Sequence, residues 1–141
     1  MRKHKGFTLI ELVVVVMILG ILAAVAAPKL LGTSSTASDN GLKETLGVVR
    51  DAIERYTAEH GGSLPGTDEP TFKAALLPYL RVFPKSPLTS TDTVEIAASA
   101  GTTSPTGTKA WMYNKADGTF IVNSTAAIKS DPTGTIHYNE L

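Results

Sequence analysis

Residues 7–28 read FTLIELVVVVMILGILAAVAAP, and this stretch decides what kind of fold the chain can adopt. As a helix it is about 33 Å long, at ~1.5 Å per residue, which is close to the ~30 Å hydrocarbon core of a bilayer. Glu11 departs from the pattern, because it places a carboxylate near the start of the apolar run. The sequence therefore predicts a membrane-spanning helix that carries one charge in need of a partner.

The residues around the apolar run leave more than one interpretation open. The basic residues Arg2, Lys3 and Lys5 precede it, and such a cluster stays cytoplasmic, so the rest of the chain crosses the membrane. A plain signal anchor fits this arrangement. A removable secretory signal also fits, because Ala24-Val25-Ala26 offers small residues for signal peptidase, and a secreted binding domain would then start after Ala26 or Ala27.

A third interpretation takes the block Gly6-Phe7-Thr8-Leu9-Ile10-Glu11 as a unit. With its short basic leader, and with Pro28 about one helix length further on, this block resembles the processing site of type IV pilin-like proteins. The resemblance implies that a prepilin peptidase cuts between Gly6 and Phe7 and methylates the new amine of Phe7. It also implies that Glu11 of one subunit meets the Phe7 amine of a neighbour during filament assembly. We favour this interpretation because all these features occur in register.

The same resemblance makes Gly20 and Pro28 the weak points of the helix, because the backbone between the corresponding residues of relatives loosens inside the filament. Beyond the span, apolar residues trace one helical face at Leu42, Leu46, Val49, Ile53 and Tyr56. Pro28 and Asn40-Gly41 are local helix breakers, so the pattern alone favours two helices. The family fold favours one long helix that ends near His60-Gly61-Gly62, and we expect the long helix, with bends at Pro28 and near Gly41.

The remaining residues predict a small head. Its expected elements are a short helix over 70–80, a strand over 93–96, a hairpin of 109–114 and 119–124 around Asp117-Gly118, and an edge strand over 136–138. We therefore expect an α+β pilin fold, in which the amphipathic half of a long N-terminal helix packs on a small antiparallel sheet. The expected organisation is a cleaved leader (1–6), a transmembrane and filament-core helix (7–28), an amphipathic helix (29–60) and a globular head (61–141).

Composition excludes several classes of protein. The chain has no cysteine, so no disulfide framework and no thiolate chemistry are available. Formal net charge is zero, but the body beyond the leader is mildly acidic, which argues against a nucleic-acid partner. The histidines lie far apart, and no catalytic motif is present, so we expect no enzyme and no zinc site.

The head most resembles those of type II secretion pseudopilins, because a Pro-rich turn precedes a Trp/Tyr hairpin. The resemblance implies an inner-membrane precursor with a cytoplasmic N-terminus and a periplasmic head. Copies of the chain and other pilin-like subunits then join in a periplasmic or surface filament. The resemblance also implies that an inner-membrane platform carries out this assembly with energy from a cytoplasmic ATPase. The main alternative is a type IV pilus subunit for adhesion, motility or DNA uptake, although those subunits commonly have a cysteine-closed C-terminal region.

We expect no cofactor. Major pseudopilins often hold calcium in a C-terminal loop, and Asp117, Asp131 and Glu140 are the candidate ligands here, but no dense acidic loop is present. Asn123-Ser124-Thr125 matches the N-glycosylation pattern, although such triplets arise often by chance. Trp111 is expected to lie in the core under the helix rather than to stack on a ligand.

Overall fold

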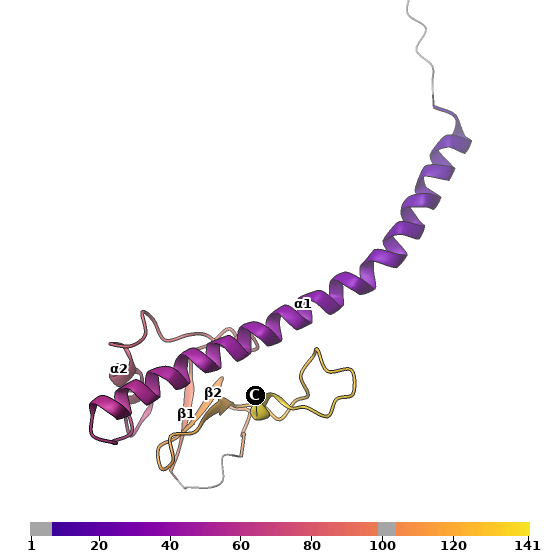
Figure 1. Ribbon diagram of the computed structural model, residues 1–141. Helices are drawn as coiled ribbons and strands as arrows, with labels where there is room; N and C mark the ends of the chain where they lie inside the picture. The colour runs from indigo at the N-terminus through magenta and orange to yellow at the C-terminus, as the bar shows by residue number, and fades with distance from the viewer. Residues whose placement is uncertain (1–6, 99–103) are drawn as a thin grey trace, which may run out of the picture. The chain divides into compact units, whose positions relative to one another are not determined.

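The computed structural model describes residues 7–98 and 104–141, and it confirms the predicted α+β, pilin-like fold. In chain order the elements are α1 (Leu9–Glu59), α2 (Glu69–Leu76), β1 (Val94–Ala97), β2 (Trp111–Asn114), β3 (Phe120–Val122) and the 3₁₀ helix η1 (Tyr138–Glu140) (Figure 1). The chain divides into two compact units, Met1–Ser35 and Thr36–Leu141. The expected leader, residues 1–6, lies outside the described residues.

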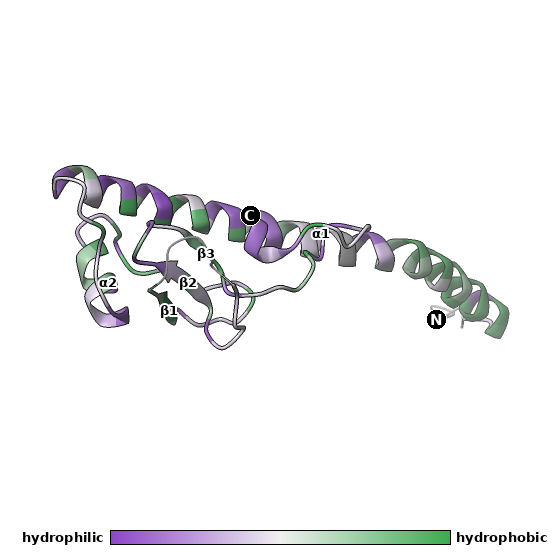
Figure 2. Ribbon diagram, turned by 90° about the horizontal axis from the view of Figure 1, so that it is seen from below, coloured by the Kyte–Doolittle hydropathy of each residue, from purple (hydrophilic) through white to green (hydrophobic). Residues whose placement is uncertain are grey.

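The first unit contributes the apolar part of α1. The helix passes through Gly20 and Pro28 without interruption, and residues 7–29 are all exposed. By length and composition α1 is able to cross a membrane, and Figure 2 shows its N-terminal part as predominantly hydrophobic. The long helix is therefore confirmed over the two-helix pattern, whereas the weakness of Gly20 and Pro28, and the expected bends, stay predictions.

The second unit is the head, and its core forms on the predicted stripe of α1. Leu42, Leu46, Val49 and Ile53 are all 5% exposed or less, and Tyr56 is partly buried beside them. Figure 2 shows α2 and the strands along one side of this part of α1. Trp111 is fully buried and its indole N–H donates to the Pro84 carbonyl at 3.2 Å. The predicted core role of Trp111 is confirmed.

The sheet differs from the predicted antiparallel one, because it is mixed. Its order is β1-β2-β3, with β2 antiparallel to β3 as the hairpin predicted, but with β1 parallel to β2. A parallel pair needs a crossover of roughly a dozen residues or more. The connection between β1 and β2, residues 98–110, is long enough to be one. The periodicity of a single strand does not reveal the direction of its partner.

Two further elements differ in detail from their predictions. The short helix begins at Glu69, where Asp68 and Thr71 form a capping box. It ends at Leu76, with Leu77 still helical in its backbone, because Pro78 has no N–H with which to continue the helical hydrogen bonds. The edge strand expected over residues 136–138 was wrong. His137 makes only an isolated bridge to Ala127, and Tyr138 already begins η1.

Tyr113 gives a stability prediction for this core. Its ring stacks on Phe72 at 4.1 Å, and its hydroxyl is buried with no hydrogen-bond partner among the described residues. An unpaired buried hydroxyl costs about 1–3 kcal/mol, so Tyr113→Phe should keep or raise the free energy of unfolding, by about 1 kcal/mol. Denaturant titration of the full chain in detergent measures this.

The matched control is Tyr138→Phe. The Tyr138 hydroxyl donates to Asp39 at 2.9 Å, so its removal should lower stability by about 1–3 kcal/mol. A loss of the same size in Tyr113→Phe would mean that the Tyr113 hydroxyl is hydrogen-bonded after all.

Candidate functional site: the N-terminal end of α1

The first turn of α1 is built around Thr8 and Glu11. The Thr8 N–H and the Thr8 hydroxyl each donate to Glu11 Oε2 at 2.9 Å, and the Glu11 N–H donates to the Thr8 hydroxyl at 3.3 Å. This reciprocal pair is a capping box, and it satisfies backbone donors that the start of a helix otherwise leaves open. Glu11 therefore has a structural reason to stand at this position within a single chain.

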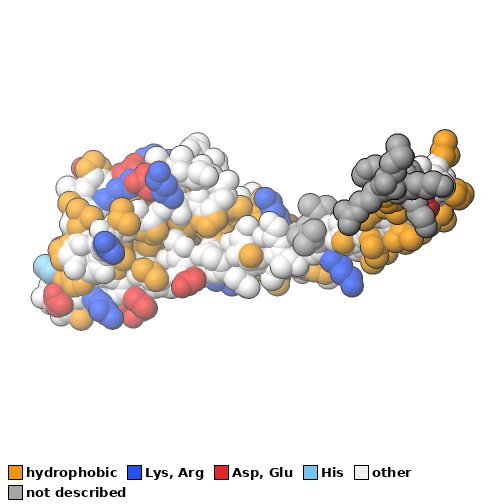
Figure 3. All heavy atoms as spheres, turned by 90° about the horizontal axis from the view of Figure 1, so that it is seen from above, with side chains coloured by type: hydrophobic (Ala, Val, Ile, Leu, Met, Phe, Trp, Pro, Cys, Tyr) orange, Lys and Arg blue, Asp and Glu red, His pale blue; other side chains and the backbone are white. Residues whose placement is uncertain are grey.

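The surroundings of Glu11 are apolar and open. Phe7, Ile10, Val14 and Val15 line a shallow groove of about 330 Å³ beside it. Phe7 is 85% exposed, and among the described residues only Thr8 donates a hydrogen bond to the carboxylate. In Figure 3 hydrophobic side chains cover the visible part of this end of the helix, while both signs of charge are scattered over the head. The site thus presents one carboxylate on a helix surface that is otherwise apolar and exposed.

The structure brings only some of the predicted site residues together. Phe7 and Glu11 share the groove, whereas Gly20 and Pro28 lie further along the same helix. Gly6 lies outside the described residues, so the predicted cut between Gly6 and Phe7 stays a prediction. Sequence reasoning missed Thr8 as the partner of Glu11, although the Thr-x-x-Glu spacing is a recognisable capping-box signal.

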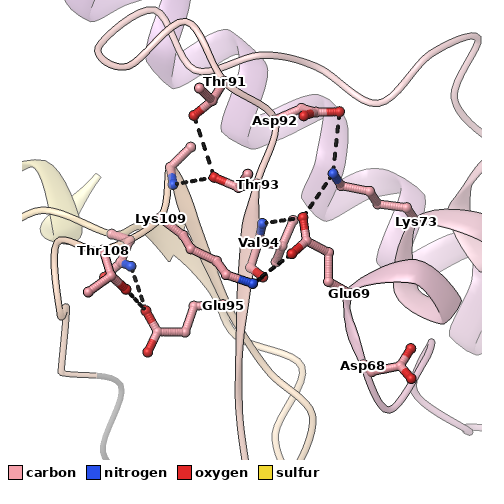
Figure 4. Close-up of polar contacts among 12 residues, drawn as sticks. Asp68, Glu69, Lys73, Thr91, Asp92, Thr93, Val94, Glu95, Thr108 and Lys109 are labelled. Atoms are coloured by element: carbon pink, nitrogen blue, oxygen red, sulfur yellow. Dashed lines mark hydrogen bonds and ion pairs between the residues drawn. The ribbon is translucent and has the colours of Figure 1, made fainter.

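The head carries a polar network around Glu69, at the start of α2. Figure 4 shows Glu69 directed toward β1, where its Oε1 accepts from the Val94 N–H at 3.0 Å. Its Oε2 accepts from Lys109 Nζ at 2.6 Å, and Lys73 pairs with Oε1 at 3.0 Å. Burial by itself raises the pKa of Glu69, but these hydrogen bonds outweigh burial and lower it from 4.5 to about 2. The network is a structural clamp between α2 and the sheet.

Glu69 predicts a pH dependence of stability. Because its pKa is lower in the folded protein, its contribution is present above pH ~4.5 and is lost as pH falls toward about 2. Allowing for partial exposure, we expect this contribution to be about 2 kcal/mol. Unfolding free energies of the wild type and Glu69→Gln should therefore differ at pH 6 and converge near pH 2. The exposed Glu44→Gln is the control, and an equal pH profile for both variants contradicts the clamp.

The candidate calcium ligands Asp117, Asp131 and Glu140 do not come together as a site. Asp117 accepts from the Thr119 N–H and the Asn114 amide, Asp131 accepts from its own loop, and Glu140 accepts from the His137 N–H. Among the described residues, no group of three or more His, Asp and Glu side chains is placed to hold a metal ion. These carboxylates serve local turns.

Asn123 is not accessible for the glycosylation that its sequence pattern suggests. It is 2% exposed, and its amide nitrogen donates to Glu95 at 2.9 Å and to Thr106 at 3.2 Å. Its amide oxygen accepts from the Thr106 N–H at 2.7 Å. The nitrogen that would carry a glycan is therefore buried and in use.

Comparison with known proteins finds a family match at the N-terminal end of the chain. Residues 1–27 match the family described as the prokaryotic N-terminal methylation motif. The chain is 46% identical over 68 residues to fimbrial protein EcpB of Eikenella corrodens, covering 48% of this chain and 42% of that protein. It is 39% identical over 69 residues to type II secretion system core protein G of Vibrio cholerae, covering 49% and 47%. The matched regions span about half the length of these curated relatives.

A longer match reaches the head. The chain is 29% identical over 152 aligned positions to type IV major fimbrial protein FimA of Dichelobacter nodosus, covering 93% of this chain and 95% of that protein. No solved structure is significantly similar to the chain. The N-terminal methylation motif, the pilin-like α+β fold and these relatives together make the chain similar to type IV pilin-like proteins.

Proposed function

We propose that the chain is a pseudopilin of a type II secretion-like machine. In this proposal it is made as an inner-membrane precursor, cut between Gly6 and Phe7 by a prepilin peptidase, and methylated on the Phe7 amine. It then polymerises through residues 7–28 with other copies and other pilin-like subunits, on an assembly platform driven by a cytoplasmic ATPase. The observation that carries the proposal is an apolar helix, exposed throughout residues 7–29, with a single carboxylate at Glu11.

The electrostatic argument begins with the cut. Cleavage converts the amide nitrogen of Phe7 into an α-amine, which is largely protonated at neutral pH. That cation stands at the N-terminus of its own helix, where the macrodipole disfavours positive charge. Within an apolar bundle of helices, the counter-charge that the family resemblance implies for it is the Glu11 carboxylate of an adjacent copy. The pair contributes little net stability, because desolvation offsets attraction, but it fixes which positions meet.

The Thr8–Glu11 contact supports this sequence of events. Before assembly the carboxylate is already held by the Thr8 N–H and hydroxyl, so a single chain carries it into the membrane hydrogen-bonded, although still without a counter-charge. Both donors bind Oε2, which leaves Oε1 with no partner among the described residues. Glu11 is therefore able to cap its own helix and to accept a second, charged donor from a neighbour.

The relatives include proteins of both alternatives, the secretion pseudopilin and the pilus subunit. One of those relatives is named for type II secretion, and two are named as fimbrial proteins. The absence of cysteine from this chain favours the secretion pseudopilin, because the heads of pilus subunits are commonly closed by a cysteine pair. A pilus subunit for adhesion, motility or DNA uptake is the second candidate.

Deletion of the gene in its native host tests the proposal. We expect secretion of folded proteins across the outer membrane to stop, while the surface fibres seen by negative-stain microscopy stay unchanged. Loss of surface fibres with normal secretion would show that the chain is a pilus subunit.

A further inference from the structure

The C-terminal loop of the head, residues 128–138, is fastened to α1 by one buried carboxylate. Asp39 lies on α1 and is 1% exposed. Its Oδ2 accepts from the Ser130 N–H at 2.7 Å, and its Oδ1 accepts from the Tyr138 hydroxyl at 2.9 Å. Lys129 adds a favourable positive charge nearby. Both oxygens of Asp39 are therefore used to hold the two ends of the loop against the helix.

A second carboxylate closes the loop from within. Asp131 Oδ1 accepts from the Thr133 N–H at 2.9 Å and from the Thr133 hydroxyl at 2.6 Å. Its Oδ2 accepts from the N–H groups of Thr135 and Ile136 at 2.8 and 2.9 Å, and from the Thr135 hydroxyl at 3.3 Å. A carboxylate offers about four lone-pair positions, so the acceptor capacity of Asp131 is full. The hydrogen bonds, led by that of the Thr133 hydroxyl, lower the pKa of Asp131.

This donor set does not fit calcium. The ion takes about six to eight oxygen ligands at roughly 2.3–2.6 Å, with carboxylates supplying most of the negative charge. Here the oxygens of Asp39 and Asp131 face N–H and O–H groups, whose positive ends would repel a cation at the same place. A calcium ion could bind only after these hydrogen bonds were broken. The N–H and O–H groups of the loop already stabilise the two carboxylates that a cation would otherwise bind.

We infer that the C-terminal loop is closed by hydrogen bonds to Asp39 and Asp131, in place of the calcium ion that the resemblance to major pseudopilins implies. The loop then holds its conformation without any metal. This inference concerns the head alone and is independent of whether the chain acts in secretion or in a pilus. It also explains the role of the two threonines in the segment Asp131-Pro132-Thr133-Gly134-Thr135. They supply hydroxyl and N–H donors to the Asp131 carboxylate.

Thermal unfolding of the full chain in detergent, with 1 mM calcium chloride or with EGTA, tests the inference. We expect the two melting temperatures to agree within about 1 °C. A site occupied at 100-fold excess of calcium over its Kd would raise the melting temperature of a head of this size by roughly 10 °C. A calcium-dependent rise of several degrees, lost in Asp131→Asn, would overturn the inference.

Limited proteolysis supplies the second readout. In Asp131→Asn the amide replaces one acceptor oxygen by a donor, so cleavage within residues 128–138 should accelerate at least several-fold, equally in calcium and in EGTA. Asp39→Asn should act in the same direction. The control is Asp51→Asn, which removes an exposed carboxylate from the same helix as Asp39 and should cleave like the wild type. Equal cleavage of Asp131→Asn and the control would also overturn the inference.

Discussion

Replacing Glu11 by valine is expected to abolish filament assembly, while membrane insertion and cleavage after Gly6 continue. Insertion should not suffer, because valine makes the span more apolar. Assembly should fail because each Phe7 amine would be buried in a helix bundle without a counter-charge. Removing one member of a buried pair costs about 3–5 kcal/mol, which weakens association of each subunit by roughly 100-fold or more. Sedimentation of filaments from cells that make equal amounts of each variant measures the effect.

The variant Glu11→Gln separates charge from helix capping. Glutamine is able to replace glutamate in the capping box with Thr8, so the helix start at Leu9 should be preserved. It carries no charge, so assembly should still fail. If Glu11→Gln assembles normally while Glu11→Val does not, the carboxylate acts on its own helix and the pairing between subunits is wrong. Normal filaments from Glu11→Val would remove the electrostatic argument altogether.

Replacing Gly66 by alanine is expected to have the largest effect on the stability of the head. Gly66 has φ +64°, which alanine adopts only at a cost of about 1–2 kcal/mol. A Cβ at this position would also overlap the backbone N and Cα of Phe72, in the first turn of α2, and would lie 2.8 Å from Phe72 Cβ. Because Phe72 is fully buried in the core, neither side moves away easily. We expect a total loss of about 3 kcal/mol or more, a large part of the stability of a small domain.

Gly107→Ala is the matched control for this prediction. Gly107 has φ +72°, but nothing lies within 4 Å of its Cβ position, so only the backbone cost applies. Denaturant midpoints should therefore fall much further for Gly66→Ala than for Gly107→Ala. Equal losses in the two variants would show that the close approach to Phe72 has no energetic consequence.

The sequence predicted features that depend on local spacing. The four-and-three repeat from Leu42 to Tyr56 placed one face of α1 in the core, as the structure confirms. Asp117-Gly118 predicted the turn between β2 and β3, where Gly118 has φ +81°. Pro28 and Asn40-Gly41 misled a purely local analysis toward two helices. A single missing hydrogen bond, or a residue of low propensity, does not end a helix that long-range packing and an apolar run both favour.

The features that escaped prediction join residues that are far apart in sequence. Asp39 binds Ser130 across 91 positions, and Glu69 binds Val94 across 25. In the sequence, neither carboxylate differs from any other polar residue of a helix. Only folding brings the hydrogen-bond donors to each carboxylate. The parallel pairing of β1 with β2 escaped for the same reason. The N-terminal site could be predicted because the residues of its motif are contiguous in the sequence. The role of Thr8 as the capping partner of Glu11 was missed.

Mass spectrometry of the mature N-terminus, on protein purified from its native membrane, tests the central claim most directly. The account predicts a chain that begins at Phe7 and carries one added methyl group on its α-amine. That product would place the new cation one helical turn before Glu11. A chain that begins at Ala27 or Pro28 would lack Glu11, and one that retains residues 1–6 would have no α-amine at Phe7, so either result would contradict the account.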